Sequence, residues 1–210
     1  MTEMHPLTQA IIDGDKAAAT ELTQRCLDDG EDAGLIVEER LVPGMAVIGE
    51  QFQQDEIFVP EMLIAANAMK ASRAILEPLI AESGVRAPHT ADIGTVQGDL
   101  HDIGKNLVGM MWRGANFEVI DLGVNVTPSD FAAAAKEHEP DIVGMSALLT
   151  TTVPHMREAV AAVKATGVET KVLVGGAPVS AEFAAEVGAD GFAVDAGAAA
   201  VVAKCLVGAA

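Results

Sequence analysis

The residues best suited to bind a ligand lie in a short glycine-flanked segment, Gly98-Asp-Leu-His-Asp-Ile-Gly104. This segment places one histidine between two aspartates. An imidazole has two ring nitrogens, and a carboxylate that binds one of them fixes the tautomer in which the other can ligate a metal. Asp99, two residues before His101, has the spacing for that task. The segment also suits an ordinary turn in which Asp99 or Asp102 caps the following helix. A hard-metal site is a third interpretation, weakened by the small number of ligands.

Two later segments carry hydroxyl groups or glycines that would suit a ligand site. Four hydroxyl side chains lie between Ser146 and Thr152, and alone they are typical of helix caps. Gly175 and Gly176 would let a ligand approach the backbone closely, although alone they are typical of a tight turn. The segment around His101 has neither the glycine pattern of dinucleotide-binding proteins nor that of phosphate-binding loops.

Strands and helices in regular alternation after residue 90 must position these segments. Short apolar runs typical of buried strands alternate with helical stretches, and this order predicts a doubly wound parallel sheet with helices on both faces. In such a sheet, ligands bind outside the carboxyl ends of the strands, where all three segments lie. The predicted strands are 93–96, 117–122, 141–146, 171–174 and 191–194, and the predicted helices are 103–114, 128–137, 153–166, 181–187 and 196–207.

The first 80 residues have helical periodicity throughout. We predict helices over 7–12, 15–28, 35–50 and 61–80, which with their short loops form a small bundle. Glycine, proline and polar residues in the segment 82–90 predict a linker. We therefore expect a helical domain over residues 1–85 and an α/β domain over residues 91–210.

The composition excludes several classes of partner and location. Among the 210 residues, 31 are acidic and 13 basic, and the net charge of −18 argues against nucleic acid and against an anionic membrane surface. Only 3% of the residues are aromatic, too few for base-stacking platforms. Cys26 and Cys205 lie far apart, so we expect neither a zinc site nor a disulfide framework, and a cytoplasmic location. We expect no signal peptide and no membrane span.

Taken together, these motifs resemble the signature of cobalamin-binding proteins. The signature is carried by Asp99-x-His101-x-x-Gly104, Ser146-x-Leu148 and Gly175-Gly176, while Gly49-Glu-Gln-Phe52 and Phe58-Val-Pro-Glu-Met62 resemble the helical cap that covers the corrin ring. Over nearly its whole length the chain is similar to the corrinoid proteins of methyltransferase systems and to the cap and cobalamin modules of methionine synthase. The resemblance implies an α/β fold: a four-helix bundle cap followed by a five-stranded, flavodoxin-like cobalamin-binding domain.

The resemblance also assigns roles to residues. His101 would be the lower axial ligand of cobalt, Asp99 would accept a hydrogen bond from its other nitrogen, and Thr152, where the family usually has serine, would complete a relay. In the cap, an apolar lid would form with Glu38 as a polar contact, although a place in the bundle core stays open for the lid residues, Met62 above all. The lid residues are Phe52, Val59 and Met62. The other cofactor-binding residues implied are Gly98, Asp102, Ile103, Gly104, Ser146, Leu148, Thr150, Gly175, Gly176 and Ala196.

The function implied by the resemblance is methyl transfer through a bound corrinoid. The protein would accept a methyl group on cobalt(I) from a substrate-specific methyltransferase and pass it to a second methyltransferase with a thiol or tetrahydrofolate-type acceptor. A reductive activase is a further partner. The chain would be the methyl-carrying subunit rather than a complete enzyme, because it has no room for a catalytic barrel.

Three alternatives have weaker support in the sequence. A cobalamin-dependent sensor or regulator usually carries a DNA-binding or signalling segment, and none is recognisable here. The cobalamin subunit of a mutase generally lacks the helical cap that the segment Phe52–Met62 resembles. A flavodoxin-like electron carrier would need aromatic residues beside its flavin, and this chain has few.

Overall fold

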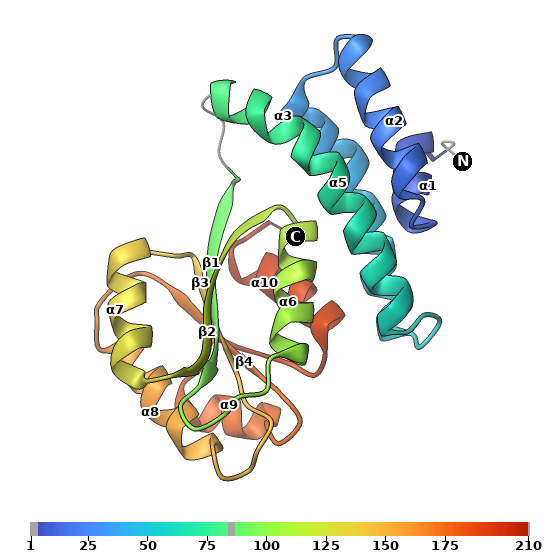
Figure 1. Ribbon diagram of the computed structural model, residues 1–210. Helices are drawn as coiled ribbons and strands as arrows, with labels where there is room; N and C mark the ends of the chain where they lie inside the picture. Colours follow the sequence, from blue (N-terminus) through green and yellow to red (C-terminus); the bar gives the residue numbers. More distant parts are fainter. Residues whose placement is uncertain (1–3, 84–86, 210) are drawn as a thin grey trace. The chain divides into compact units, whose positions relative to one another are not determined.

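The computed structural model describes residues 4–83 and 87–209. The chain divides into two compact units (Figure 1). One unit contains the residues up to Pro88 together with Gly114–Asn116, and the other contains His89–Arg113 and the residues from Phe117 onward. No helix within the described ranges is long and apolar enough to cross a membrane.

The first unit is entirely helical among its described residues, which confirms the predicted bundle. Aspartates set the starts of two helices, since the carboxylate of Asp15 accepts the N–H of Ala18 at 2.9 Å and that of Asp32 accepts the N–H of Gly34 at 2.9 Å. Aliphatic side chains and methionines, Met62 among them, fill the core. The elements are α1 (Pro6–Ile12), α2 (Lys16–Asp28), α3 (Ala33–Ile36), η1 (Val37–Leu41), α4 (Val42–Gln53) and α5 (Val59–Ser83).

Two local features of this unit differ from the sequence prediction. The single helix predicted over 35–50 is divided into α3, the π-helical turn η1 and α4. A π turn adds a residue to the helical repeat without interrupting the apolar pattern strongly enough to be recognised in sequence. In addition, α5 continues through Pro78 to Ser83 and the next strand begins at His89, so the linker is shorter than 82–90; its residues 84–86 lie outside the described ranges.

The second unit is the predicted α/β domain with a five-stranded parallel sheet. The strand order is β2-β1-β3-β4-β5, the flavodoxin-like order. All five predicted strands are present, although β1 and β2 are longer than predicted. The elements are β1 (His89–Val96), α6 (Ile103–Gly114), β2 (Phe117–Val126), α7 (Pro128–His138), β3 (Ile142–Ser146), α8 (Val153–Lys164), β4 (Lys171–Gly175), α9 (Ala181–Val187), β5 (Gly191–Ala193) and α10 (Ala196–Leu206).

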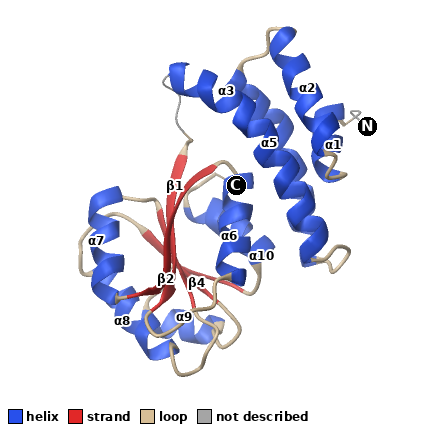
Figure 2. Ribbon diagram, viewed as in Figure 1, coloured by secondary structure: helices blue, strands red, loops and turns tan. Residues whose placement is uncertain are grey.

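Helices cover both faces of this sheet (Figure 2). On one face, α7, α8 and α9 share an apolar core with the strands, with Phe131 and Met156 fully buried. On the other face, the buried Trp112 of α6 lies against β3 so closely that a Cβ at Gly144 would be 2.5 Å from its ring. The Trp112 indole N–H also donates to the Ala199 carbonyl of α10 at 3.0 Å, which ties the two helices of this layer together.

The strand order locates the position where a ligand site is expected. From β1 the chain crosses to β2 on one side, and β3 then lies on the other side of β1. The loops that leave β1 and β3 therefore diverge and leave a crevice at the carboxyl edge of the sheet. These are the loops that carry Asp99, His101 and Thr152.

Candidate functional site

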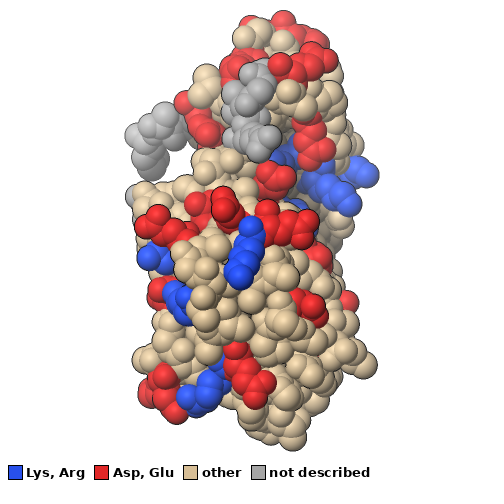
Figure 3. Space-filling model, turned by 90° about the vertical axis from the view of Figure 1, so that its left-hand side faces the viewer, with Lys and Arg blue, Asp and Glu red and all other residues tan. Residues whose placement is uncertain are grey.

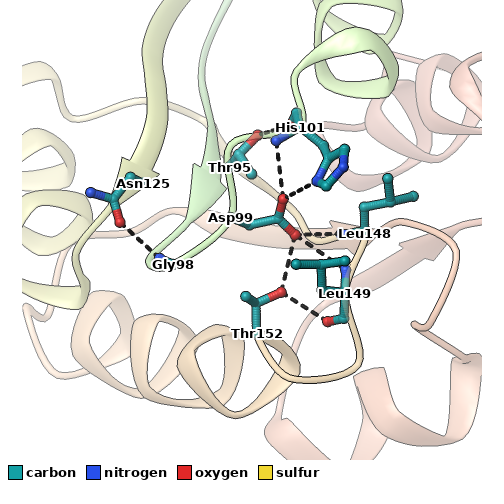
Figure 4. A network of polar contacts seen from close by, with 8 residues as sticks. All are labelled: Thr95, Gly98, Asp99, His101, Asn125, Leu148, Leu149 and Thr152. Atoms are coloured by element: carbon teal, nitrogen blue, oxygen red, sulfur yellow. Dashed lines mark hydrogen bonds and ion pairs between the residues drawn. The ribbon is translucent and has the colours of Figure 1, made fainter.

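Asp99 is the centre of a polar network that joins the loops after β1 and β3 (Figure 4). Its side chain is fully buried. One carboxylate oxygen, Oδ1, lies 2.7 Å from Nδ1 of His101 and accepts the His101 backbone N–H at 3.0 Å. The other, Oδ2, accepts the backbone N–H groups of Leu148 at 2.7 Å and Leu149 at 3.2 Å, and the hydroxyl of Thr152 at 3.0 Å. Five donors thus converge on one carboxylate.

These donors decide the charge of Asp99. Burial alone raises the pKa of this carboxyl, because the charged form loses its hydration. The backbone N–H groups of Leu148 and His101, the His101 ring and the N–H of Leu149 act in the opposite direction, and together they hold the pKa well below its usual range. Asp99 is therefore an anion at neutral pH.

The charge of Asp99 fixes the tautomer of His101. An ionised carboxylate only accepts hydrogen bonds, so Nδ1 of the neutral ring must carry the proton that faces Asp99. The lone pair of the neutral ring is then on Nε2. Because the His101 side chain is 52% exposed, the ring is accessible to a ligand. This is the arrangement in which proteins orient a histidine for a metal.

Thr152 occupies the N-cap position of α8, yet its side chain makes no hydrogen bond to that helix. Its hydroxyl lies 3.0 Å from Oδ2 of Asp99 and 2.8 Å from the Leu149 carbonyl oxygen. A threonine at this position normally caps its own helix. Here the hydroxyl serves the carboxylate instead, so the residue expected to complete the Asp99 network is in direct contact with it.

The residues predicted after β3 and β4 lie together at the same edge. Ser146 pairs with Gly175 in the register of the two strands. Gly176 has φ +121°, and a Cβ there would be 1.9 Å from the carbonyl oxygen of Ala147, so only glycine fits. Leu148 is 45% exposed, and Thr150 is also exposed and makes no hydrogen bond to Asp99 among the described residues. Ala196 is buried at the start of α10.

The residues predicted around His101 itself are open to solvent. Gly98, with φ +82°, Asp102 and Gly104 are all exposed, and nothing lies within 4 Å of a Cβ at Gly104. Ile103, the first residue of α6, is 74% exposed. None of these features is required for packing, so the space around the histidine is available to a ligand.

Large apolar side chains are exposed in the loops after β1, β3 and β5, which leave the same edge of the sheet. Exposed apolar surface at one edge is typical of ligand or partner sites. A half-exposed imidazole with apolar surroundings fits a large, mostly apolar macrocycle with a central metal. The exposed apolar side chains are Leu100, Ile103, Leu148, Leu149 and Val194.

The four cap residues belong to the helical unit and are described within it. Met62 is 1% exposed and lies in the bundle core, which is the alternative left open by its spacing. Phe52 and Val59 are half-buried, and Glu38 is exposed on the π turn. Phe58, to which we had assigned no role, is the most exposed aromatic residue of this unit, at 65%.

Two residues that support the His101 loop were not identified from the sequence. The hydroxyl of Thr95, fully buried in β1, donates to the His101 carbonyl at 2.9 Å. Asn125, at the end of β2, accepts the Gly98 N–H at 2.8 Å through its side-chain oxygen. Thr95 could have been identified as the hydroxyl residue of the predicted strand 93–96, which is otherwise apolar. For Asn125, the only sequence feature is that it follows Gly123 by two residues.

A second group of ligand-type side chains occurs in the helical unit. Donor atoms of His5, Cys26 and Glu31 lie within 4.8 Å of one another. Each has another role: Nδ1 of His5 accepts the Leu7 N–H at 3.2 Å, and Glu31 pairs with Arg40 at 3.3 Å. Burial and then the neighbouring Glu31 raise the pKa of the Cys26 thiol to about 11, so it is protonated at neutral pH. The contacts of these three residues are thus explained without a metal.

The sheet unit presents a half-exposed histidine whose ring is held by a buried carboxylate. Residues 90–203 match the B12 binding domain family, and residues 4–77 match a second B12 binding domain family. The chain therefore belongs to the B12-binding proteins, and cobalamin or a related corrinoid is its cofactor.

Several individual proteins and solved structures are similar to this chain over most of its length. The chain is 43% identical over 198 residues to a corrinoid protein of Desulfitobacterium hafniense, covering 92% of each chain. It is 38% identical over 185 residues to trimethylamine corrinoid protein 1 of Methanosarcina acetivorans, covering 86% of each. A solved cobalamin-binding protein from Desulfitobacterium hafniense DCB-2 is similar with a TM-score of 0.80, 33% identity and coverage of 95% of this chain and 96% of that one. The methanol:cobalamin methyltransferase complex of Methanosarcina barkeri gives a TM-score of 0.85, 25% identity and coverage of 98% and 79%.

Proposed function

We propose that this protein is a corrinoid methyl carrier, which takes a methyl group from a substrate-specific methyltransferase and gives it to a second methyltransferase. The observation that carries the proposal is the pair formed by His101 and Asp99, in which the ring is half-exposed and its Nδ1 is held by a buried anion at 2.7 Å. The relatives named as trimethylamine and dimethylamine corrinoid proteins support the link to methyl transfer.

The residues of the site have separate tasks in this function. When bound, the corrinoid supplies a cobalt(I) nucleophile that takes up the methyl group and later gives it up. His101 would hold the cobalt through Nε2, and Asp99 would keep the ring in the required tautomer. The loops after β1, β3 and β5 would supply apolar surface for the macrocycle. Gly176 keeps the backbone at this edge in a conformation that no other residue adopts easily.

Asp99 and Thr152 would support His101 during turnover. The buried Asp99 carboxylate lies 2.7 Å from Nδ1 of His101 and would keep the ring oriented toward the cofactor. The Thr152 hydroxyl, 3.0 Å from Oδ2 of Asp99, would complete the relay through which a proton accompanies a change of the lower ligand.

The proposed function also requires partner proteins. We infer a first methyltransferase specific for an amine, an alcohol or another methylated compound, and a second with a thiol or tetrahydrofolate-type acceptor. A reductive activase would restore cobalt(I) after oxidation. All three would meet the protein in the cytoplasm.

The first test measures the axial ligand. The purified protein is loaded with hydroxocobalamin, freed of excess cofactor, reduced to the cobalt(II) state and examined by EPR. We expect about one corrinoid per chain and the superhyperfine coupling of a single nitrogen, and we expect His101→Ala to lose that coupling. His155→Ala is the matched control, because His155 is another partly exposed histidine paired with a carboxylate, Glu158 at 3.3 Å, in the same unit.

A second measurement separates a carrier from a sensor. The reduced, loaded protein is incubated with methyltransferases supplied with trimethylamine, dimethylamine or methanol, and methylation of cobalt is followed by absorbance. A carrier takes up one methyl group per cobalt from one of these systems. A protein that binds corrinoid but is methylated by none of them is not a carrier for these amines or for methanol, and one whose nitrogen coupling survives His101→Ala contradicts the proposal.

A further inference from the structure

The end of strand β2 has an irregular register beside the His101 loop. Ile93 of β1 pairs with Asp121, but Gly94 pairs with Gly123 and Val96 with Val126, so β2 contains one extra residue at each of two consecutive steps. The backbone at both steps is left-handed, with φ +85° at Gly123 and φ +55° at Asn125. Bulges are rare in parallel pairs and are concentrated next to functional sites, where they redirect side chains.

The second bulge places Asn125 against the loop that carries the site. Its side-chain oxygen accepts the N–H of Gly98 at 2.8 Å (Figure 4). The backbone N–H of Asn125 donates to the carbonyl of Asp99 at 3.0 Å. The two bonds hold the Gly98–Asp99 dipeptide at its first N–H and at its last carbonyl group. Rotation of this dipeptide would carry the Asp99 carboxylate away from His101, and Asn125 opposes that rotation.

The first bulge fixes the other side of the same loop. Oδ1 of Asp121 accepts the N–H of Gly123 at 2.8 Å, and the ammonium group of Lys105 lies 2.6 Å from Oδ2 of the same carboxylate. Lys105 is 3% exposed and lies in the first turn of α6, immediately after the His101 loop. The end of β2 therefore holds the loop before Asp99 through Asn125 and after His101 through Lys105.

The left-handed backbone of Asn125 is energetically unfavourable, so other interactions must stabilise it. A residue with a side chain is strained in the left-handed region, and asparagine is among the few that adopt it. Strand β2 is at the edge of the sheet and could end without a second bulge. The two hydrogen bonds that Asn125 makes with Gly98 and Asp99 offset the cost of its left-handed backbone.

We propose that Asn125 is a positioning residue for His101: it holds the Gly98–Asp99 dipeptide so that Asp99 meets the imidazole before any corrinoid binds. Only the identity of the ligand that His101 receives rests on the proposed function. The orientation of the loop is a property of the corrinoid-free protein and is tested separately from it.

Three variants isolate this role. Asn125→Gly removes the side-chain acceptor while tolerating the left-handed backbone, and Asn125→Asp retains an acceptor at the same place. Asn116→Gly is the matched control, because Asn116 also has a left-handed backbone, with φ +67°, but precedes the other end of β2. If Asn125→Gly only weakened the fold, Asn116→Gly would be expected to produce similar effects.

The first readout uses the corrinoid-free protein. The Nδ1 proton of His101, held between the ring and Asp99, is followed by NMR together with the amide proton of Gly98. We expect both protons to exchange with water about five- to tenfold faster in Asn125→Gly, as follows from the loss of one hydrogen bond. Asn125→Asp and Asn116→Gly are expected to keep the wild-type rates at both protons.

The second readout uses the corrinoid-loaded protein in the cobalt(II) state. The ratio of cobalt with nitrogen coupling to cobalt without it is measured by EPR at neutral pH. Weaker preorganisation lowers the affinity of the ring for cobalt, so this ratio should fall about five- to tenfold in Asn125→Gly. Total corrinoid retained should change little.

The outcomes separate the two proposals. Wild-type exchange rates and an unchanged ratio of coupled to uncoupled cobalt in Asn125→Gly, or equal effects of Asn116→Gly, would overturn the positioning role of Asn125 whatever the cofactor does. Absence of nitrogen coupling in the wild-type protein would overturn the role of His101 in cobalt binding. Faster exchange in the corrinoid-free variant would still support the positioning of the loop by Asn125.

Discussion

A single buried carboxylate determines the chemistry of this site. Asp99 receives donors from its own loop and from the loop after β3, and it is these donors that allow a fully buried aspartate to remain ionised. Its charge in turn dictates which nitrogen of His101 is free. The histidine was the conspicuous residue of the sequence, but the aspartate two positions earlier decides what the histidine can do.

The depressed pKa of Asp99 makes its contribution to stability depend on pH. Its pKa is lower in the folded than in the unfolded protein, so this contribution is complete well above the ordinary aspartate pKa of about 3.9 and decreases as the pH falls through that value. Asp99→Asn replaces an acceptor by an amide that faces backbone N–H groups, and we expect it to lower the free energy of unfolding at pH 7 by about 2–4 kcal/mol. The difference from wild type should narrow at pH 3.

Urea unfolding of the corrinoid-free protein at both pH values measures this difference. Asp102→Asn is the matched control, since it removes an exposed carboxylate from the same loop. A gap between wild type and Asp99→Asn that is the same at pH 7 and pH 3 would mean that ionisation of Asp99 is not what stabilises the network.

At the scale of elements, two glycines of the predicted site, Gly104 and Gly176, differ in whether the fold requires glycine at their positions. A Cβ at Gly176 would be 1.9 Å from the Ala147 carbonyl oxygen, so Gly176 is required by the close approach of two loops. A Cβ at Gly104 meets nothing within 4 Å, and this position lies in the first turn of α6. Both glycines are predicted to contact the cofactor, but only Gly176 is explained by the protein's own packing.

This contrast predicts opposite phenotypes for two alanine substitutions. Gly176→Ala should destabilise the sheet unit by about 3 kcal/mol or more, because the obstacle is backbone and the φ angle is unfavourable. Gly104→Ala should be neutral or stabilising by up to about 1 kcal/mol, as for alanine in a helix, yet retain less corrinoid. Thermal unfolding without cofactor and cobalt retention after gel filtration separate the two effects. Full retention of corrinoid by Gly104→Ala would contradict the assignment of Gly104 to the cofactor.

The elements also explain how far the sequence could predict the site. The order of strands and helices was predictable because each apolar run is short and each helix periodic, and parallel strands bring their carboxyl ends to one edge. The contacts of Asp99 with His101 and Thr152 were implied by a family resemblance. The bulges of β2 were not predictable, since they depend on pairing register and on a left-handed Asn125 that has no local signature. The π turn η1 was not predictable because one added residue in a helix leaves its apolar pattern nearly unchanged.

At the scale of the whole molecule, excess negative charge is the dominant property. The chain carries 31 acidic and 13 basic residues, and Figure 3 shows a face on which acidic side chains are spread over the surface with fewer basic ones among them. Such a distribution is self-repulsive in the folded state. It is compatible with partners that present basic surfaces, although the composition identifies none of them.

Self-repulsion predicts that salt stabilises this protein. Raising the ionic strength from about 0.01 to 0.15 M shortens the screening length from about 30 to 8 Å, which weakens repulsion between distant carboxylates more than attraction within close ion pairs. Such a pair is formed by Lys105 and Asp121 at 2.6 Å. We expect the apparent Tm to rise by about 2–4 °C, equivalent to about 1 kcal/mol, in sodium chloride and equally in potassium chloride. An unchanged or lower Tm would mean that close ion pairs, rather than net charge, dominate the electrostatic contribution to stability.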